Sequence, residues 1–472
     1  MTHERTDPAV PRQVEAVAPD APVPAASVPR SATAAGAVTA DGAATGGDGV
    51  TGGGGVTGGG VPRRNWAGNV RYSARAYHRP TSVDELRRLV AGSRRVRAVG
   101  SGHSFNRLGD TDGALVSLAG LPREISIDRE RRRVTVAAAL RYGDVATHLH
   151  AEGWALANLA SLPHISVAGA VATGTHGSGE GNGNLASAVA GLELVTADGD
   201  LLRVDRDADG DTFAGMVVNL GARGVVTRVT LDLVPAFEIR QYVHLDLPRE
   251  ELDPAFASAY SVSLFTDWRT PRINQVWRKQ RADQPAPPAG WLGTTAAGAP
   301  LHPVPGMPAE NCTRQLGVPG PWHERLPHFR LGFTPSSGDE LQSEYHVPRA
   351  AAAEVLAALD PIAHLIAPVL QICELRAVAA DPLWLSPNHD RDSLAVHFTW
   401  IDDADAVLPV VAAVEERLAP WRPRPHWGKV FDMAPEQVAA AYPRYADFAD
   451  LLRRMDPEGV FRTALLDRYF PR

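Results

Sequence analysis

Two glycine-rich segments are the places where the backbone itself can bind a charged ligand. The first, Gly100-Ser-Gly-His-Ser104, directly follows the strand-like run Val96–Val99, and the second extends from Ser166 to Gly179. Backbone N–H groups freed by glycine can surround a phosphate, and small side chains let another molecule approach the backbone closely. Each segment alone also fits a tight turn or a surface loop. Together they predict a ligand whose pyrophosphate group lies between them.

A second set of reactive side chains lies in apolar surroundings towards the C-terminus. Glu374-Leu-Arg376 and His397-Phe-Thr399 alternate, so a strand would direct both polar groups of each pair to one face. The segment His426-Trp-Gly-Lys429 follows. Two interpretations stay open: salt bridges on a solvated sheet face, or a polar pocket for a small hydroxylated molecule. In such a pocket, Arg and Lys side chains near a redox ring would stabilise negative charge as it develops.

Other catalytic patterns are not found in the sequence. There is no Gly-x-Ser-x-Gly elbow of the hydrolases, and His323 and His328 are five residues apart, which is not the zinc-binding H-E-x-x-H spacing. The two cysteines make neither a disulfide framework nor a zinc cluster, and no metal site is predicted. His103 and His176 lie within the glycine-rich segments, where spacing alone leaves structural, hydrogen-bonding and nucleophilic roles open.

Composition narrows the class of protein further. The net charge of −7 argues against a nucleic-acid binder, because phosphate binding needs a basic face. No apolar run reaches the roughly 18 residues of a membrane span. The N-terminus lacks a charged start followed by an apolar core, so no signal peptide is expected and the location is predicted to be cytoplasmic. The length of 472 residues suggests two or three domains.

The elements that position these residues indicate an α+β fold. Residues 1–62 are rich in Gly, Ala and Pro and contain no aromatic residue, so they are predicted to form a disordered extension. Beyond them, short strands and helices alternate irregularly, which is typical of the α+β class. From about Glu238, long proline-rich loops indicate a second domain. The clearest expected elements are helices over 142–153, 350–359, 404–418 and 445–455 and strands over 96–99, 192–195, 224–233 and 394–400.

At these residues the sequence resembles the sugar-alcohol (alditol, xylitol) oxidases of the vanillyl-alcohol oxidase superfamily of flavoproteins. The resemblance covers Asn65 to about Phe461. It is carried by six motifs: Asn65-Trp-Ala-Gly-Asn69, Gly100-Ser-Gly-His-Ser-Phe-Asn106, Ser161-Leu-Pro-His-Ile-Ser-Val-Ala-Gly169, Ala172-Thr-Gly-Thr-His-Gly177, His302-Pro-Val-Pro-Gly-Met-Pro308 and His426-Trp-Gly-Lys429. The last two are typical of this subfamily rather than of flavoproteins at large.

The resemblance implies a two-lobed architecture and an activity. Residues 63–235 would form the FAD-binding domain, 236–432 a substrate (cap) domain with an antiparallel sheet flanked by helices, and 433–472 a return to the FAD domain. The activity would be oxidation of the terminal primary hydroxyl of a polyol such as xylitol or sorbitol to the aldose. Molecular oxygen would be reduced to hydrogen peroxide. The chain would act as a monomer, with neither a nucleic-acid nor a membrane partner.

The resemblance also assigns roles to residues. His103 would form a covalent bond to the 8α carbon of FAD. The other FAD-binding residues would be Val99, Gly100, Ser101, Gly102, Ser104, Ser161, Ser166, Gly169, Thr173, Gly174, Thr175, His176 and Val226. Those that bind the polyol would be Ser161, Glu374, Arg376, Thr399 and Lys429, and those that act in catalysis Lys429, Arg376 and His397. The proton acceptor stays open among His397, Glu374 and Lys429.

Several alternatives remain at this stage. An aldonolactone oxidase or a flavin dehydrogenase of the same superfamily would use related residues with another substrate or electron acceptor. A non-catalytic FAD-carrying or sugar-binding protein is less compatible with His103, Glu374, Arg376 and Lys429 together, because a binding module needs no hydride geometry. Glu180, directly after the second glycine-rich segment, is interpreted as a solvated loop residue rather than a substrate ligand.

Overall fold

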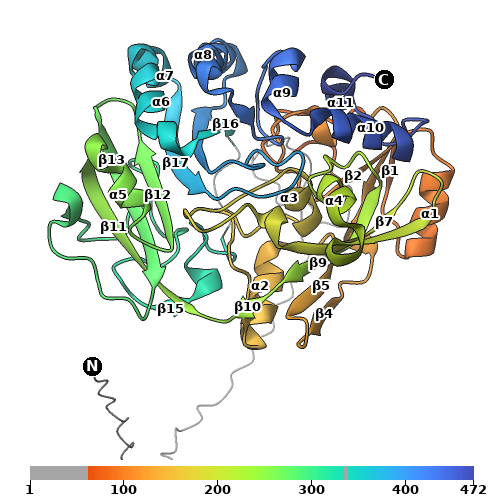
Figure 1. The fold of residues 1–472 in the computed structure, drawn as a ribbon, viewed down its shortest axis with the longest axis horizontal. Helices are drawn as coiled ribbons and strands as arrows, with labels where there is room; N and C mark the ends of the chain where they lie inside the picture. The colour runs from red at the N-terminus through yellow and green to blue at the C-terminus, as the bar shows by residue number, and fades with distance from the viewer. Residues whose placement is uncertain (1–61, 334–338) are drawn as a thin grey trace, which may run out of the picture. The chain divides into compact units, whose positions relative to one another are not determined.

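The computed structural model describes residues 62–333 and 339–472, so the predicted disordered extension over 1–62 lies outside the described residues apart from Pro62. The first half of the described chain contributes a parallel sheet of order β1-β3-β2 and an antiparallel sheet of order β4-β5-β9-β7-β8 (Figure 1). Their strands are β1 (Ala76–His78), β2 (Val96–Val99), β3 (Ala114–Ser117), β4 (Ile125–Asp128), β5 (Arg133–Ala137), β7 (Val189–Val195), β8 (Leu201–Asp205) and β9 (Val225–Asp232).

Strand β2 presents the first glycine-rich segment at its carboxyl end. It pairs in parallel with β3, with Val99 opposite Ser117, and the chain leaves the sheet at Gly100. Gly102 then adopts φ of 73°, a left-handed conformation that only glycine takes without strain. The turn is therefore fixed by the backbone, and the Gly102 carbonyl accepts a hydrogen bond from the Trp66 N–H at 2.8 Å.

The second half of the described chain forms a large antiparallel sheet of order β14-β11-β13-β12-β17-β18-β16-β19, in which β15 also pairs with β11. Its strands are β11 (Glu238–Pro248), β12 (Ser261–Thr266), β13 (Arg272–Arg281), β14 (Thr295–Ala296), β15 (Gly320–Pro321), β16 (Glu340–Pro348), β17 (Leu370–Val378), β18 (Ser393–Ile401) and β19 (Arg424–Pro425). A short antiparallel pair joins β6 (Trp154–Ala155), from within the first half, to β10 (Val234–Pro235), which directly precedes the large sheet in sequence. The predicted α+β class is confirmed.

The large sheet has one apolar and one polar face, because successive side chains of a strand point to opposite sides. On one face, Tyr345, Val396 and Phe398 belong to the main hydrophobic core, and the hydroxyl of Tyr345 donates to Glu415 of α8 (Ala404–Leu418) at 2.8 Å. Figure 1 shows α8 beside α6 (Ala352–Leu359) and α7 (Ala363–Ile366) at the end of this sheet. The opposite face carries the charged side chains described below.

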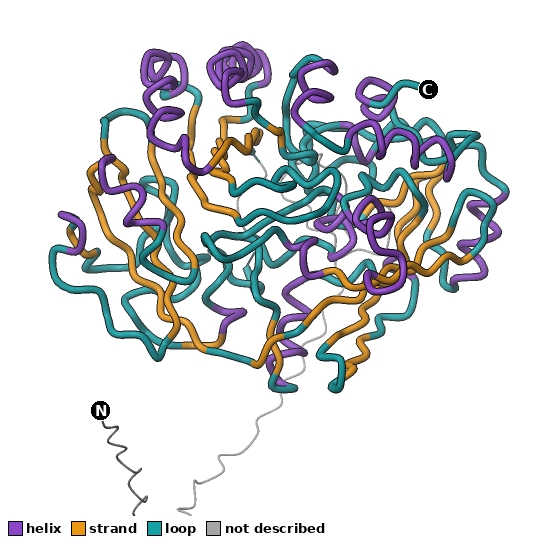
Figure 2. The backbone as a smooth tube through the Cα atoms, viewed as in Figure 1, coloured by secondary structure: helices purple, strands orange, loops and turns teal. Residues whose placement is uncertain are grey.

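The remaining helices lie mostly in the first half and at the C-terminus. They are α1 (Val83–Ala91), α2 (Tyr142–Ala151), α3 (Val167–Ala172), α4 (Arg206–Val217), α5 (Leu252–Phe256), α9 (Pro435–Ala441), α10 (Tyr445–Met455) and α11 (Ala464–Tyr469). The helices predicted over 404–418 and 445–455 have the bounds of α8 and α10, and α2 ends two residues earlier than predicted. Figure 2 shows loops and turns crossing the region between the large sheet and the β4-β5-β9-β7-β8 sheet.

The second glycine-rich segment differs from the sequence expectation. It was expected to be a loop from Ser166 onwards, but Val167–Ala172 forms the helix α3. Val167 and Val171 of this helix are buried in the main core. The burial of these side chains outweighs the poor helix propensity of a Val- and Gly-containing sequence, which is why local reasoning missed the helix.

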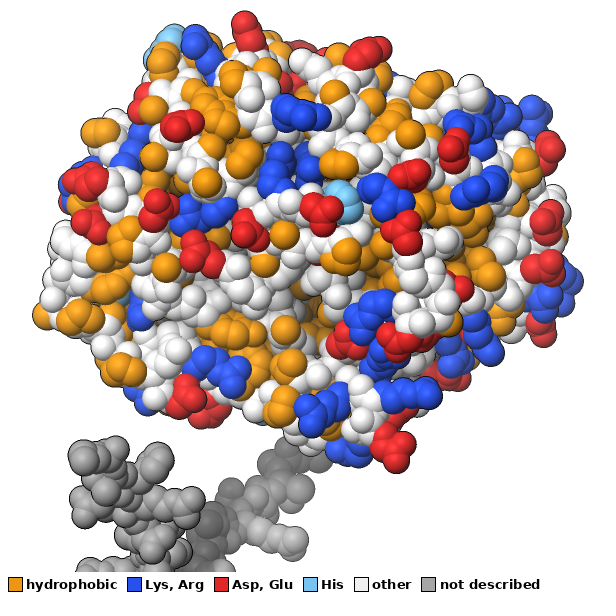
Figure 3. Space-filling view, viewed as in Figure 1, with side chains coloured by type: hydrophobic (Ala, Val, Ile, Leu, Met, Phe, Trp, Pro, Cys, Tyr) orange, Lys and Arg blue, Asp and Glu red, His pale blue; other side chains and the backbone are white. Residues whose placement is uncertain are grey.

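The surface carries charges of both signs. On the face drawn in Figure 3, Lys and Arg side chains are interspersed with Asp and Glu, with hydrophobic side chains between them. Many arginines are paired, for example Arg206 with Asp232 at 2.7 Å and Arg129 with Glu152 at 2.6 Å. Among the described residues, none of the helices combines the length and the apolar character that crossing a membrane requires.

Candidate active site

A cavity of about 440 Å³ lies where the end of β2, helix α3 and the polar face of the large sheet meet. Of the residues that the sequence predicts for the site, those that line it are Val99, Gly100, Ser101, Gly102, His103, Ser104, Ser161, Ser166, Gly169, Thr173, Thr175, His176, Val226, Glu374, Arg376, His397, Thr399 and Lys429. Gly174 does not line the cavity; its φ is 67°, and a Cβ there would lie 3.0 Å from Pro387. Residues almost 330 positions apart are thereby brought to one cavity.

The two glycine-rich segments form one wall of this cavity. The backbone N–H of Ser166 donates to the Ser101 hydroxyl at 3.2 Å. A Cβ on Gly100 would lie only 2.1 Å from the Ser166 hydroxyl oxygen, and one on Gly169 would lie 2.8 Å from the same atom. Since such distances are impossible for a real side chain, glycine at these positions is what lets the segments approach one another and leaves their backbone open to a ligand.

His103 projects from this wall, and the backbone of Ser101 lies beside its ring. Both of its ring nitrogens are buried and unpaired among the described residues. Its ring stacks on Trp66 with the ring centroids 4.7 Å apart and the planes inclined by 17°. Burial, with a contribution from the charge of Lys429, lowers the pKa of His103 to about 3. The imidazole is therefore neutral at physiological pH, and buried nitrogens without a hydrogen bond are unusual in folded proteins.

The opposite wall is the polar face of the large sheet. The strand register places Glu374 of β17 opposite His397 of β18, and His397 opposite Glu344 of β16. Arg376 and Thr399 lie two residues along β17 and β18, so they share this face. Glu374 and Arg376 are only 6% and 5% exposed. The alternative of salt bridges on a solvated sheet face is therefore wrong: these charges are buried in the cavity wall.

Glu344, which sequence reasoning missed, is the centre of the buried charges. Its carboxylate accepts hydrogen bonds from His176 Nε2 at 2.9 Å, Arg376 Nη2 at 2.7 Å and His397 Nδ1 at 3.2 Å. Burial alone would raise its pKa, but the charge of Arg376 and the two imidazoles hold the pKa of Glu344 well below its usual value. Glu344 is thus a permanent carboxylate that orients three side chains of the cavity.

Glu374 is held by a different set of partners. Its Oε1 accepts from His328 Nε2 at 2.7 Å and lies 3.6 Å from Arg376 Nε. Burial raises its pKa, but the charge of Arg376 and the His328 hydrogen bond outweigh that effect and lower the pKa of Glu374 below its usual value. His328 in turn contacts Lys279, a fully buried lysine of β13, through its Nδ1 at 2.9 Å. Neither His328 nor Lys279 was singled out from the sequence as part of this site.

His397 has both ring nitrogens engaged. Because Glu344 is ionised and can only accept, Nδ1 donates to Glu344, and Nε2 accepts from the Thr399 hydroxyl at 3.2 Å. Burial lowers the pKa of His397, although the charge of Glu344 opposes the effect. The result is a neutral imidazole whose basic nitrogen faces the Thr399 hydroxyl on the cavity wall.

Lys429 reaches the cavity from the C-terminal segment. Its ammonium group donates to the Gln342 side chain and lies 5.0 Å from the centre of the Phe105 ring. Burial lowers its pKa to about 8, against the attraction of Glu344. Asn106 holds the Lys429 backbone in place, because its side-chain amide donates to the Lys429 carbonyl at 2.8 Å. The first glycine-rich segment and the C-terminal segment are therefore tied together beside His103.

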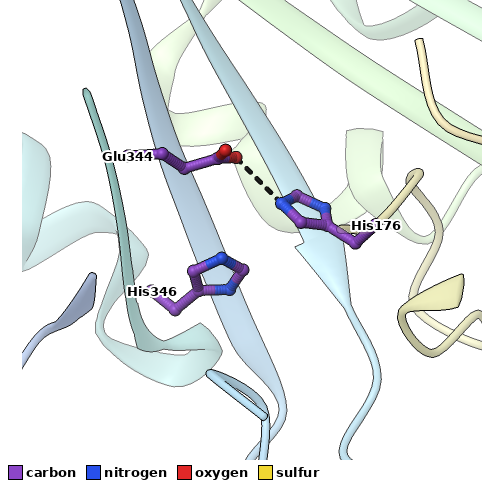
Figure 4. A group of neighbouring side chains, drawn as sticks. All are labelled: His176, Glu344 and His346. Carbon is purple, nitrogen blue, oxygen red and sulfur yellow. Dashed lines mark hydrogen bonds and ion pairs between the residues drawn. The ribbon is translucent and has the colours of Figure 1, made fainter. Parts of the chain in front are cut away.

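A group of His176, Glu344 and His346 has atoms within 4.8 Å of one another, a spacing that also occurs in metal sites (Figure 4). Figure 4 shows the two histidines and the carboxylate pointing toward one another, with the His176–Glu344 hydrogen bond dashed. His176 Nε2 and the guanidinium of Arg376 already occupy one oxygen of Glu344, and His346 Nδ1 contacts Asn388 at 2.9 Å. The carboxylate charge is thus balanced by protein donors, and of the three residues His176 and Glu344 line the cavity.

The sequence around Glu344 contains a pattern that could have pointed to this residue. Gln342-Ser-Glu344-Tyr-His346 alternates polar and less polar residues just as the segments around Glu374 and His397 do. Glu180, in contrast, lies away from the cavity lining: its carboxylate accepts from Arg349 at 2.8 Å near the surface. It is thus a surface ion-pair partner, and no described contact links it to the site.

Family models match both halves of the chain. Residues 74–205 match the model described as "FAD binding domain", and residues 339–469 match the model described as "D-arabinono-1,4-lactone oxidase". The first match includes His103 and both glycine-rich segments, and the second includes Glu344, Glu374 and Lys429. Each wall of the cavity therefore lies in a region that one of the two family models matches.

Solved structures show the same fold. A cholesterol oxidase from Brevibacterium sterolicum, the His121Ala mutant, superposes with a TM-score of 0.71 over 86% of this chain and 96% of its own, at 15% sequence identity. At that identity the likeness concerns the fold alone. Together with the family models, it defines the class of protein as an FAD-binding flavoprotein of the vanillyl-alcohol oxidase type.

Curated relatives identify the family within this class. An alditol oxidase from Streptomyces sp. (strain IKD472 / FERM P-14339) is 55% identical over 408 residues, which are 85% of this chain and 97% of the relative. L-gulonolactone oxidase from Mus musculus is 27% identical, with 87% and 98% covered, and L-gulono-1,4-lactone dehydrogenase from Mycobacterium tuberculosis (strain ATCC 25618 / H37Rv) is 29% identical, with 84% and 96% covered. The chain belongs to the alditol oxidase family of the vanillyl-alcohol oxidase superfamily.

Proposed function

We propose that this protein oxidises the terminal primary hydroxyl of a polyol, such as xylitol or sorbitol, to the aldose. The observation that carries the proposal is the polar cavity wall, where buried and ionised Glu374 and Arg376 lie beside Thr399, opposite the glycine-rich wall. A polyol presents a row of hydroxyl groups that need matched donors and acceptors. The 55% identity to an alditol oxidase supports the same substrate class.

The residues of the glycine-rich wall fit FAD as the cofactor. The orphaned nitrogens of His103 and the open backbone at Gly100 and Gly169 are features that a bound dinucleotide would use. FAD, when bound, accepts the hydride of the carbinol carbon and passes the electrons to oxygen, which gives hydrogen peroxide. We further propose that His103 bonds covalently to the 8α carbon, because its imidazole is neutral and held flat against Trp66. The new C–N bond would replace a C–H bond of the 8α methyl group, whose proton would be released, and the two electrons left on the flavin ring would pass to oxygen.

The domain division follows the two walls. Residues 63–235 with the return segment 433–472 would form the cofactor domain, and residues 236–432 the substrate domain. Strands β1–β9 lie within the first range, and the large sheet lies within the second. The cavity is then a site between the two domains, as is usual for enzymes that bind two ligands.

The polar wall would bind the polyol through complementary hydrogen bonds. Glu374 can only accept, Arg376 and Lys429 can only donate, and the Ser161 and Thr399 hydroxyls can do both. Arg376 Nη1 already donates to the Ser161 hydroxyl at 3.3 Å, so these two groups are positioned together. A substrate hydroxyl that finds no partner costs about 1–3 kcal/mol when buried. Chain length and stereochemistry would be sensed in this way.

His397 is the proton acceptor that the geometry favours among the three candidates. Its Nε2 is unprotonated and reaches the cavity wall at Thr399, while Nδ1–H is held by Glu344, which would stabilise the imidazolium. Glu374 has a pKa below its usual value and is a weaker base, and Lys429, with a pKa of about 8, is mostly protonated at pH 7. Lys429 and Arg376 would instead offset the negative charge of the reduced cofactor.

The activity is tested with the purified protein and xylitol. We expect xylitol to bleach the flavin absorbance under nitrogen and to generate peroxide in air, whereas His397→Asn should bleach at least 100-fold more slowly with its FAD still bound. Xylitol that leaves the flavin oxidised would refute the polyol oxidation. Acid precipitation tests the covalent link separately: yellow colour should stay with the protein and move to the supernatant in His103→Ala.

A second candidate is oxidation of an aldonolactone, with oxygen or another acceptor. The match of residues 339–469 to the D-arabinono-1,4-lactone oxidase model and the likeness to gulonolactone enzymes favour it. Anaerobic bleaching by L-gulono-1,4-lactone that is faster than by xylitol would select it, and dye reduction without peroxide would indicate a dehydrogenase. The monomeric state, the cytoplasmic location, the lack of nucleic-acid and membrane partners and the lack of a metal site stay predictions.

A further inference from the structure

A buried chain of three polar side chains lies behind the polar wall of the cavity. Lys279 of β13 contacts His328 Nδ1 at 2.9 Å, and His328 Nε2 contacts Glu374 Oε1 at 2.7 Å. Lys279 is 1% exposed and does not line the cavity itself, whereas His328 and Glu374 do. The register of the sheet places β12 between β13 and β17, so Lys279 acts on Glu374 from two strands away.

The groups around Lys279 can accept hydrogen bonds from its protonated amino group. Besides His328, its amino group contacts the Leu326 and Pro327 carbonyl oxygens, which can only accept hydrogen bonds. An ammonium group can donate to all three acceptors at once. Burying a lysine costs much free energy unless it is compensated, and Glu374 supplies the compensating charge. The polar groups facing Lys279 are His328, Glu374, Cys312 and Arg376.

The chain holds one proton between Lys279 and His328. If the proton is on Lys279, the ammonium donates to Nδ1 of a neutral His328; if it is on His328, Nδ1–H donates to a neutral amine. In both arrangements Nε2–H points to Glu374, because the ionised carboxylate can only accept. Burial lowers the pKa of Lys279 to about 7 and that of His328 to about 4, which fits a pair that holds a single proton.

The orientation of His328 is fixed by packing as well as by hydrogen bonds. Its ring lies 5.1 Å from the ring of Trp277 and 5.6 Å from that of Phe265, both with edge-to-face geometry. Its backbone N–H donates to the Ser161 carbonyl at 3.0 Å. The imidazole therefore cannot turn away from Glu374 without disturbing a buried aromatic cluster, and Nε2 stays on the carboxylate.

We infer that Lys279 and His328 are positioning residues that, together with Arg376, hold Glu374 as a carboxylate with Oε1 occupied and Oε2 available to accept a hydroxyl of the substrate. Both side-chain contacts of Glu374 among the described residues involve Oε1. The inference rests on the proposed function, since it assigns Oε2 of Glu374 as the acceptor for a polyol hydroxyl. A substrate group that has no proton to donate could not make this hydrogen bond. The site would thus favour substrates with a free hydroxyl at this position.

Lys279→Met tests the inference in the holoenzyme, with Arg278→Met as the matched control. Arg278 is the adjacent buried cation of β13, but it bonds to Ser258 and Gln280, away from the cavity. Anaerobic mixing with xylitol from pH 5 to 9 gives the dissociation constant and the limiting rate of flavin bleaching. We expect Lys279→Met to weaken xylitol binding about 10- to 100-fold, as for one lost buried hydrogen bond. Its binding should also worsen as the pH falls, because Glu374 becomes protonated at a higher pH than in the wild type, and Arg278→Met should do neither.

Four further variants connect the effect to Glu374. Glu374→Gln should remove the pH dependence, and Lys279→Met added to Glu374→Gln should change the dissociation constant no further. His328→Gln keeps a donor for Glu374 and an acceptor for Lys279, so it should retain the wild-type pH profile, whereas His328→Leu should behave as Lys279→Met does. Equal effects of the methionine variants at positions 278 and 279, or additive effects in the double variant, would overturn the inference.

A measurement without substrate separates this inference from the proposed function. Infrared difference spectra of the holoenzyme carrying ¹³C-glutamate report the protonation of Glu374 when compared with Glu374→Gln. We expect no protonation of Glu374 between pH 5 and 9 in the wild type, and protonation of its carboxyl at a higher pH in Lys279→Met than in the wild type. If xylitol does not bleach the flavin but this shift is found, the polyol activity fails while the positioning role stands; identical infrared titrations would refute the positioning role.

Discussion

Replacing Glu344 by glutamine removes the charge at the centre of the buried network and keeps the size of the side chain. The carboxylate accepts three hydrogen bonds, from His176, Arg376 and His397, at 2.9, 2.7 and 3.2 Å. The glutamine side chain has one acceptor oxygen, and its NH₂ group would face one of the three donors His176, Arg376 and His397. Arg376 would keep only Glu374 as a charged partner, 3.6 Å from its Nε.

The expected cost is about 3–5 kcal/mol, the range for breaking a buried ion pair by removing one partner. For a folded part of roughly 400 residues, the entropy of unfolding is about 0.8 kcal/mol/K. Glu344→Gln should therefore lower the apparent Tm of the holoenzyme by about 4–6 °C. The limiting rate of flavin bleaching should also fall, because His397 loses the acceptor that fixes its Nδ1–H.

The pH dependence has a defined sign. The folded-state pKa of Glu344 lies well below its usual value of 4.5, so its stabilisation is fully present above that value and is lost as the pH falls through the folded-state pKa. The Tm difference between wild type and variant should be constant from pH 6 to 9 and shrink below about pH 4.5. Thermal unfolding followed by flavin and tryptophan fluorescence measures it.

A surface carboxylate provides the control. Glu324 is 60% exposed and lies 3.7 Å from Arg325, and such exposed pairs contribute at most about 1 kcal/mol. Glu324→Gln should leave the Tm within about 1 °C of the wild type. A Glu344→Gln variant that is equally unaffected at pH 7, or whose deficit grows as the pH falls toward 4.5, would show that the carboxylate does not hold the network together.

Three more changes test other parts of the site. Gly100→Ala places a Cβ 2.1 Å from the Ser166 hydroxyl oxygen, so it should lower the FAD content of the purified protein. The double variant Gly100→Ala with Ser166→Gly should recover much of the FAD content. The ratio of flavin to protein absorbance measures both effects. Gly177→Ala places a Cβ 2.3 Å from the Leu159 carbonyl oxygen, which cannot swing away, so the Tm should drop by several degrees, and an unchanged Tm would contradict the close packing seen there. In the wild type the limiting bleaching rate should decrease as the pH rises through about 8, where Lys429 loses its proton, whereas Lys429→Met should be slow at every pH; a wild-type rate that rises through pH 8 would instead make Lys429 a base.

Local sequence patterns were sufficient for much of the fold and one wall of the site. Strand β2 ends at Val99 because the glycine-rich segment follows it, and the helices predicted over 404–418 and 445–455 have the observed bounds of α8 and α10. Both glycine-rich segments were recognised from composition alone. Within the second segment the helix α3 was not predicted, because α3 is stabilised by core packing rather than by its own helix propensity.

The second wall needed the tertiary structure. Alternation within 374–376 and 397–399 placed each pair on one face, but no local pattern says that β16, β18 and β17 are neighbours. Glu344 therefore stayed hidden, although its segment alternates in the same way. Lys279 and His328 are further examples, because nothing in their own segments indicates that they meet Glu374.

The sequence by itself thus determined the family, the glycine-rich wall and the polar residue pairs at 374–376 and 397–399. These features depend on short-range properties: the freedom of glycine, the two-residue period of a strand and motifs of adjacent residues. Only the tertiary structure decided which carboxylates share a guanidinium, which histidines are neutral and which lysine is buried behind the wall. Those properties arise from long-range strand pairing and from burial, which set the distances and the pKa values of Glu344, Glu374 and Lys279.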